Sequence, residues 1–232
     1  MVYKKETMSV KKILVVAPHP DDETLGCGGT LLRHIAKGDQ VHWLIMSTII
    51  QGPGLTQEEV DSRSKEIIEV AKSYQFSSFK QAKFIATKLD IYPKSELIEF
   101  VSEAVRRVEP DTVYLPYWGD SHSDHTEVFN AVASCTKSFR YPSVKRVRAY
   151  ETLSETEFSI RPEGSGFRPN LWVDISGYLD KKINIMKIYK GELGDHPFPR
   201  SEINLRAIAA LRGSNAGVEA SEGFVSLIDI VI

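Results

Sequence analysis

The chain has 232 residues, with 29 Lys plus Arg against 31 Asp plus Glu, and its 42% of hydrophobic residues is typical of a folded domain. Charge is balanced and no run of one sign dominates, so neither nucleic acid nor a membrane surface is expected as a partner. No apolar run approaches the roughly 18 residues of a membrane span, and the N-terminus lacks the apolar region of a signal peptide. We therefore predict one cytoplasmic domain over residues 1–232, with residues 1–10 as a loosely ordered extension.

A polar cluster directly follows the first predicted strand. Residues 13–17 are continuously apolar and rich in β-branched side chains, which is typical of a parallel strand covered on both faces. The polar residues that follow are His19, Asp21, Asp22 and Glu23. Open α/β sheets bind ligands just beyond the carboxyl ends of their strands, and Pro18 and Pro20 stiffen the turn that carries the imidazole. Taken alone, the cluster also fits an acidic helix start.

Helices and strands then alternate along the chain. A helix is predicted over 24–37, and its glycines at 26, 28 and 29 indicate close packing on the sheet. Further strands are predicted at 40–46, 84–86 and 112–115. One further helix is predicted to begin at a capping box formed by Thr56 and Glu59, and another is predicted over 95–108. This alternation predicts βαβ crossovers, and hence a single Rossmann-like, three-layer α/β domain with a mostly parallel sheet.

A second polar cluster follows the fourth predicted strand. It contains His122 and His125, whose spacing of three places both on one side of a first helical turn. Because strand ends share one edge of a sheet, His19, one of the two aspartates and one of these histidines can converge. Two imidazoles and a carboxylate with an open position match a catalytic zinc site. Helix capping on a polar surface is the plainer alternative for the two histidines.

The other histidines carry less weight in the prediction. His34 and His42 fall inside a predicted helix and a predicted strand, away from the clusters, and we interpret them as structural. His196 lies in a Pro-rich loop over 194–200, which we expect at the substrate entrance. The two cysteines, Cys27 and Cys135, are too few for a disulfide framework and are expected to be small buried side chains.

The two clusters together carry a resemblance to a known family. Residues 17–23 read Ala-Pro-His-Pro-Asp-Asp-Glu, and residues 122–125 read His-Ser-Asp-His. The first resembles an Ala-His-Pro-Asp-Asp-Glu signature with one proline inserted, and the second resembles a His-x-Asp-His motif. These are signatures of the PIG-L/LmbE-like zinc N-deacetylases, which act on N-acetylglucosaminyl intermediates. Residues 63–71 and the Gly217, Glu222 and Phe224 spacing match the family more loosely.

The resemblance implies a role for each residue of the clusters. It implies one Zn²⁺ per chain, with Fe²⁺ or Co²⁺ as alternatives, held by His19, Asp22 and His125. Asp21 would then be the general base and His122 the group that stabilises the oxyanion. Asp124 would hold the His122 imidazole in the required tautomer. Arg63, in the matched helix, would bind substrate.

The implied activity is removal of an N-acetyl group from a small N-acetylated amino sugar or glycoside, which releases acetate and a free amine. A homo-oligomer is compatible with the sequence. The loop at 47–55 should border the substrate, but it lacks the Thr-Asn-Gly or Thr-Asp-Gly of many relatives, so the acceptor stays open. Two alternatives remain: a zinc amidohydrolase acting on a non-sugar amide, and a non-catalytic member that binds a sugar or a partner. A pure binding site has no use for Asp21, which argues against the second.

Overall fold

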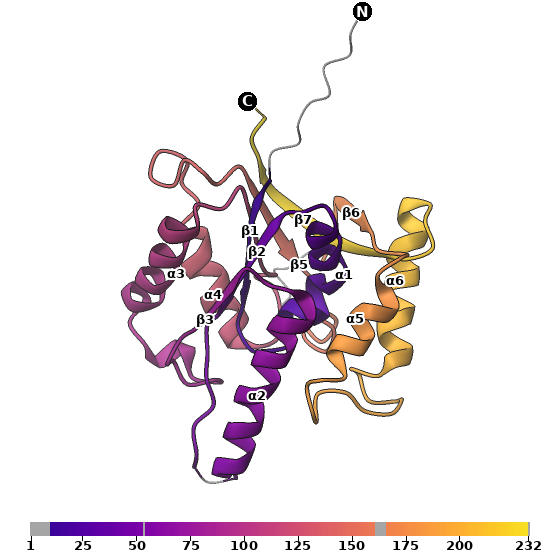
Figure 1. The fold of residues 1–232 in the computed structure, drawn as a ribbon, viewed down its shortest axis with the longest axis horizontal. Coiled ribbons are helices and arrows are strands. Elements are labelled where there is room, and N and C mark those ends of the chain that lie inside the picture. The colour runs from indigo at the N-terminus through magenta and orange to yellow at the C-terminus, as the bar shows by residue number, and fades with distance from the viewer. Residues whose placement is uncertain (1–9, 53, 161–165, 232) are drawn as a thin grey trace, which may run out of the picture.

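The structure, a computed structural model, describes residues 10–52, 54–160 and 166–231. A seven-stranded sheet with the order β3-β2-β1-β4-β5-β7-β6 lies at its centre (Figure 1). The strands are β1 (Lys12–Ala17), β2 (Gln40–Ile45), β3 (Ser78–Gln81), β4 (Thr112–Pro116), β5 (Arg146–Tyr150), β6 (Leu171–Asp174) and β7 (Ser221–Asp229). Neighbours pair in parallel from β3 to β5, whereas β7 runs antiparallel to both β5 and β6.

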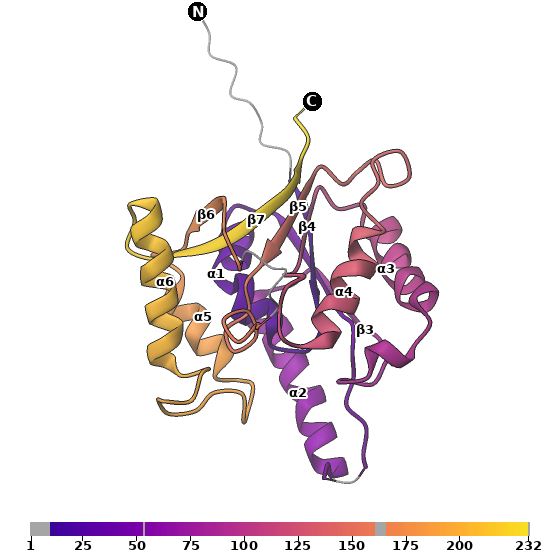
Figure 2. The same cartoon turned by 180° about the vertical axis from the view of Figure 1, so that it is seen from behind.

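Helices cover both faces of the sheet, as Figures 1 and 2 show from opposite sides. One face carries α3 (Lys94–Val108) and α4 (Ser123–Ala133), and a 3₁₀ turn, η1 (Leu89–Ile91), precedes them. The other carries α1 (Asp22–Ala36), α2 (Gln57–Tyr74), α5 (Leu179–Met186) and α6 (Glu202–Ala216). Successive residues of β1 enter opposite cores, which explains its unbroken apolar sequence. The predicted three-layer α/β architecture is confirmed.

The third strand was predicted in the wrong place. Ser78–Gln81 pairs with β2, whereas the predicted residues 84–86 contribute only an isolated bridge between Thr48 and Ile85. As an edge strand, β3 is half-exposed and mostly polar, so its apolar signal is weaker than that of the segment after it. Phe84 packs against the α3 and α4 core from a loop, which gave that segment the appearance of a strand.

Glycine is required where α1 crosses the sheet. A Cβ on Gly26 would lie 2.2 Å from the Tyr150 ring of β5, and one on Gly29 would lie 2.7 Å from the Ile175 side chain. No side chain fits at either distance, which confirms the predicted close packing of the glycine segment. The close approach sets the N-terminus of α1 against the carboxyl ends of the strands.

Helix α1 also bends at Cys27, whose φ of −144° and ψ of 19° are not helical. The bend frees the backbone amides of Gly29 and Thr30, and the Glu222 carboxylate of β7 accepts from them at 2.9 and 2.7 Å. Lys182 of α5 lies 2.7 Å from the same carboxylate, and both side chains are buried. The last strand of the chain therefore caps the second half of its first helix.

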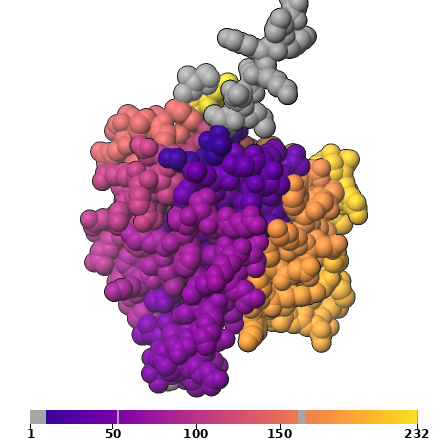
Figure 3. Space-filling model, viewed as in Figure 1, coloured from indigo at the N-terminus to yellow at the C-terminus, as the bar shows by residue number. Residues whose placement is uncertain are grey.

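The last third of the chain packs beside the N-terminal half, and Figure 3 shows its orange and yellow surface next to the purple one. In the described ranges, no helix is long and apolar enough to cross a membrane. Of the predicted N-terminal extension over 1–10, residues 1–9 lie outside the described residues. Both cysteines are buried and unpaired with one another, as expected.

Candidate functional site

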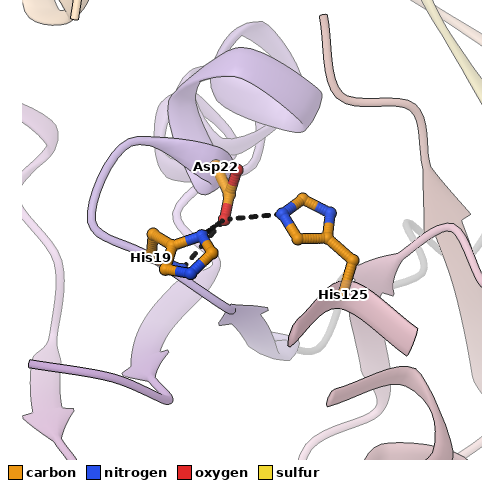
Figure 4. Close-up of side chains that lie close together, drawn as sticks. All are labelled: His19, Asp22 and His125. Carbon is orange, nitrogen blue, oxygen red and sulfur yellow. Dashed lines mark hydrogen bonds and ion pairs between the residues drawn. The ribbon is translucent and has the colours of Figure 1, made fainter. Parts of the chain in front are cut away.

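Three side chains from two strand-to-helix junctions meet at one edge of the sheet (Figure 4). His19 follows β1, Asp22 begins α1, and His125 lies in the first turn of α4. The Asp22 Oδ2 atom lies 3.3 Å from His19 Nδ1 and 3.3 Å from His125 Nε2. One ligand atom from each residue falls within 4.8 Å of the others, a spacing that one metal ion could bridge. We call these residues the His-Asp-His cluster.

The sheet topology explains why these residues converge. Strand order reverses between β1 and β4, because the chain leaves β1 toward β2 and later returns to the other side. Ligands of open α/β sheets bind at such a switch point, beyond the carboxyl ends of the strands. The predicted meeting of two clusters that lie about a hundred residues apart follows from this geometry.

A second carboxylate contacts each histidine of the cluster. Asp124 Oδ2 lies 3.0 Å from His19 Nε2, and Asp120 Oδ2 lies 2.8 Å from His125 Nδ1. Carboxylates in this position fix the tautomer and the ring orientation of metal-ligating imidazoles. Thr156 Oγ1 in turn donates to Asp120 at 2.6 Å. The second nitrogen of each ring, His19 Nδ1 and His125 Nε2, faces Asp22. Together with the Asp22 carboxylate, these two nitrogens are suitable ligands for a divalent cation.

The electrostatics of the cluster also favour a cation. Burial opposes protonation of His125, but Asp22 and Asp120 raise its pKa well above the usual range. Burial likewise opposes protonation of His19, yet hydrogen bonds with Asp124 and Asp22 raise its pKa to about 9. A field that holds protons on two neighbouring imidazoles holds a metal cation for the same reason.

The Asp124 carboxylate has a different partner from the predicted one. It accepts from the Thr87 and Leu89 amides at 2.7 and 3.1 Å and contacts His19. His122 instead accepts, through Nδ1, a hydrogen bond of 3.1 Å from the Asp124 backbone amide. The reason is that His122 is the N-cap of α4, so its ring turns back over the first helical turn. Helix capping, the plainer alternative for His122, is thus part of its role.

Asp21 lies beside the cluster with only 4% of its surface exposed. Burial, followed by the charges of Asp22 and Glu192, raises its pKa well above the usual range, although Arg200 acts in the opposite direction. The Arg200 Nη1 atom donates to Asp21 Oδ2 at 3.0 Å and lies 3.0 Å from Glu192 Oε2. Asp21 is thus a buried carboxyl group that shares one arginine with Glu192.

The backbone of Asp21 is strained, with a φ of 138° that non-glycine residues rarely adopt. Glu23 holds this conformation, because its Oε2 accepts from the Asp21 amide at 3.1 Å. The other oxygen of Glu23 accepts from the Thr24 and Tyr189 hydroxyls at 2.6 and 2.7 Å. Complete burial raises the pKa of Glu23 to about 7. Glu23, the last residue of the first motif, therefore supports the strained turn at Asp21.

A cavity of about 230 Å³, here called the site cavity, opens over the cluster. The residues that line it include all three cluster members, Asp21, His122, Ser47, Thr48, Ile49, Arg63, Thr87, Glu155, Glu192 and Arg200. Arg63 reaches it from α2 and forms an ion pair with Glu192. Among the described residues of the predicted substrate loop, 47–52, 54 and 55, only the first three line the cavity.

The remaining histidines lie outside the site cavity. His34 contacts Asp39 and Tyr114, and His42 contacts Ser78, which agrees with the structural role predicted for both. His196 is exposed and borders a different hollow. From the same loop Arg200, and not His196, lines the site cavity, so the loop over 194–200 borders the cavity through its last residue.

Sequence reasoning missed three residues of the site: Asp120, Glu192 and Arg200. Asp120 had a usable signal, because it lies five residues before His125 in the same polar loop. Glu192 and Arg200 follow α5 in a segment without a recognisable motif, and only the tertiary fold brings them to the first strand.

Comparison with known proteins places this geometry in context. Residues 14–136 match the family model described as PIG-L: GlcNAc-PI de-N-acetylase. The chain is 27% identical to diacetylchitobiose deacetylase of Thermococcus kodakarensis, over 92% of this chain and 82% of the relative. The crystal structure of the conserved protein TT1542 from Thermus thermophilus aligns with a TM-score of 0.74 at 26% identity, covering 96% of this chain and 97% of that one.

The fold is also shared with GalB, the 4-carboxy-2-hydroxymuconate hydratase of Pseudomonas putida. That structure aligns with a TM-score of 0.72 at 20% identity and covers 96% of this chain and 98% of its own. The architecture by itself therefore does not determine the reaction, which depends on the residues of the site. The family model covers more than half of the 232 residues. The chain therefore belongs to the PIG-L family, that is, to the PIG-L/LmbE-like N-deacetylases.

Proposed function

We propose that this chain is a metal-dependent hydrolase that removes the N-acetyl group from a small amino sugar or glycoside and releases acetate and a free amine. The observation that carries the proposal is the His-Asp-His cluster beside a non-ligand carboxylate, Asp21, in an open cavity. The family and the diacetylchitobiose deacetylase relative support amino-sugar deacetylation over other amide hydrolysis.

We infer that His19 Nδ1, an oxygen of Asp22 and His125 Nε2 hold one ion per chain. Zinc suits two imidazoles and a carboxylate well, and Fe²⁺ or Co²⁺ accept the same ligands. When bound, the ion would polarise the amide carbonyl and lower the pKa of a water molecule. Asp124 and Asp120 would keep the two imidazoles in the tautomers that face Asp22.

Asp21 is the group best placed to move protons. Its carboxylate would take a proton from the attacking water and return it to the departing nitrogen. Burial raises the pKa of Asp21, which makes its carboxylate a stronger base than an exposed aspartate. Arg200 would hold the carboxylate in place without binding the substrate carbonyl.

His122 would donate a hydrogen bond to the developing oxyanion. Burial, and then His19, lower its pKa, so the ring is neutral at pH 7. Because Nδ1 accepts from the Asp124 amide, the single ring proton lies on Nε2. A donor fixed in this way stabilises charge that appears only in the transition state. Arg63, which lines the cavity while paired with Glu192, is in a position suited to sugar hydroxyls.

The test is acetate release from a panel of amides by protein loaded with one equivalent of zinc. The panel should contain N-acetylglucosamine, diacetylchitobiose, N-acetylated glycosides and several non-sugar acetamides. Asp21→Asn is the matched control, because it keeps the size of the side chain and cannot transfer the proton. Cleavage of the non-sugar acetamides alone would favour the amidohydrolase alternative. Sugar binding without any acetate release would identify a non-catalytic binding protein.

A further inference from the structure

A second cavity, of about 340 Å³, lies beside the C-terminal half of α1 and is called here the α1 pocket. Its principal lining residues are Thr30, Arg33, Lys37, Tyr114, Arg148 and Trp172. It shares no lining residue with the site cavity. Helix α1 starts at the His-Asp-His cluster, and a rise of 1.5 Å per residue separates its two ends by roughly 20 Å. The α1 pocket is therefore a separate site.

The charge of the α1 pocket is predominantly positive. One carboxylate, that of Asp174, also lines the pocket beside the three cations. Arg33 donates to the Asp174 carbonyl at 2.8 Å and lies 3.8 Å from its carboxylate, so the charge of Arg33 is partly balanced. In the part of the chain that the structure describes, neither Lys37 nor Arg148 forms an ion pair. The helix dipole explains a lysine at the end of α1, but it does not explain Arg148 on β5.

Two buried polar atoms in the α1 pocket lack a hydrogen-bond partner among the described residues: Arg148 Nε and Thr30 Oγ1. Thr30 is only 1% exposed. Buried polar atoms are nearly always paired, so these two call for a partner. The guanidinium nitrogen can only donate, and the nearby Tyr114 hydroxyl already contacts Arg148 Nη1 at 3.3 Å and His34 Nε2 at 3.0 Å. The missing group must therefore be a hydrogen-bond acceptor.

An aromatic side chain forms the outer wall of the α1 pocket. Trp172 lies on the edge strand β6, lines the pocket and keeps 36% of its surface exposed, so part of its ring is accessible to a ligand. Its position beside the cations offers an apolar surface to any non-ionic part of a ligand. The pocket thus combines a cationic interior with a flat apolar wall.

We propose that the α1 pocket binds the phosphate group of a small phosphomonoester, whose uncharged part lies against Trp172. A phosphate dianion supplies three acceptor oxygens, which can serve Arg148 Nε, Thr30 Oγ1 and Lys37 Nζ together. A carboxylate has one charge and two oxygens, so it leaves part of this donor set unpaired. The site is independent of the chemistry proposed for the His-Asp-His cluster.

Calorimetric titration of the zinc-loaded protein at constant ionic strength tests the proposal. The probes are phenyl phosphate, inorganic phosphate and benzoate. We expect phenyl phosphate to bind most tightly and benzoate most weakly. Arg148→Met should raise the dissociation constant of phenyl phosphate by about tenfold or more, the usual effect of losing a charged hydrogen bond. Lys37→Met should raise it severalfold, and Arg107→Met, which removes an exposed cation on α3, should leave it unchanged.

Lys37→Met keeps the test decisive even if Arg148→Met does not fold, because Lys37 is exposed at a helix end. Equal affinity of both variants and the wild type for phenyl phosphate would overturn the proposal. So would the absence of measurable binding at millimolar phosphate. Binding that survives in both variants but is lost in His125→Ala would place the anion at the His-Asp-His cluster and would equally overturn it.

Discussion

The two sides of the site cavity are built in different ways. The side that bears the His-Asp-His cluster comes from short, stiff junctions after β1 and β4, and a second carboxylate contacts each of its imidazoles. The opposite side, with Arg63, Glu192 and Arg200, is a chain of alternating charges drawn from α2 and the segment after α5. We infer that the first side carries the chemistry. The second side positions Asp21 through Arg200 and selects the substrate through Arg63, and the following experiments test that division.

Asp22→Ala should have the largest effect, because it removes the carboxylate that lies between both imidazoles. We expect metal content and deacetylation to be lost together, as measured by metal analysis of protein purified without chelator and by acetate release. A variant that retains a full equivalent of metal would show that the ligand set is different.

Asp21→Asn should retain the metal and lower kcat by about 10²- to 10⁴-fold, the usual range for general acid–base catalysis. Asparagine is nearly the same size and shape as aspartate, so the substitution adds no steric demand at the positive φ of this position and the turn should survive. Loss of metal from this variant would reverse the roles assigned to the two aspartates. Metal analysis beside steady-state kinetics distinguishes the two cases.

His122→Ala should lower kcat and kcat/KM by similar factors, on the order of 10²- to 10³-fold, because an oxyanion donor acts in the transition state. Metal content should not change. A rise in KM with kcat preserved would instead make His122 a substrate-binding residue. The helix-capping bond to the Asp124 amide is also lost, so the melting temperature of the variant must be measured as a control.

Asp120→Asn should weaken metal affinity by about 10- to 100-fold while activity at saturating metal is largely kept. The amide can still contact His125 but no longer carries the charge that favours a cation. Competition with a chelator measures the change. An unchanged affinity would mean that Asp120 only positions the loop through Thr156.

Arg63→Ala should have the smallest effect, a rise in KM of about tenfold with little change in kcat, as expected for binding that is uniform along the reaction. Arg107→Ala, on an exposed helix surface, is the matched control. If KM does not change, Arg63 serves only to position Glu192, and substrate selection must be sought elsewhere in the cavity.

The first side of the cavity could be predicted from sequence because its signals are local. Apolar strands followed at once by His, Asp and Glu residues indicate both the sheet and the edge at which the side chains meet. The partner of Asp124 could not be predicted, because it depends on the ring orientation of a helix-capping histidine. Arg200 meets Asp21 across 179 residues, and no pattern in either segment encodes that contact.

The strands of the sheet also differ in how well they could be predicted from sequence. Strands buried on both faces gave strong signals, whereas the half-exposed edge strand β3 gave less signal than the apolar loop after it. No element after α4 was assigned from sequence. Strand β6 has only four residues and none is fully buried, and the buried first half of β7 reads Ser-Glu-Gly-Phe, so neither shows a run of apolar residues. A strand buried on both faces can be predicted from its own apolar residues. A strand whose place depends on an antiparallel partner elsewhere in the chain cannot.

The capping of α1 by Glu222 has a consequence for the order of events during synthesis. The amides of Gly29 and Thr30 emerge early from the ribosome, but the carboxylate that satisfies them is made almost two hundred residues later. If α1 and α5 packed in their final positions before Glu222 was made, these amides would lack their acceptor and Lys182 would be buried without its counter-charge, at a cost of about 3–5 kcal/mol. The first motif is therefore translated early, whereas its support from β7 comes late, and we expect a nascent chain that ends before residue 222 to bind metal less tightly than the full chain.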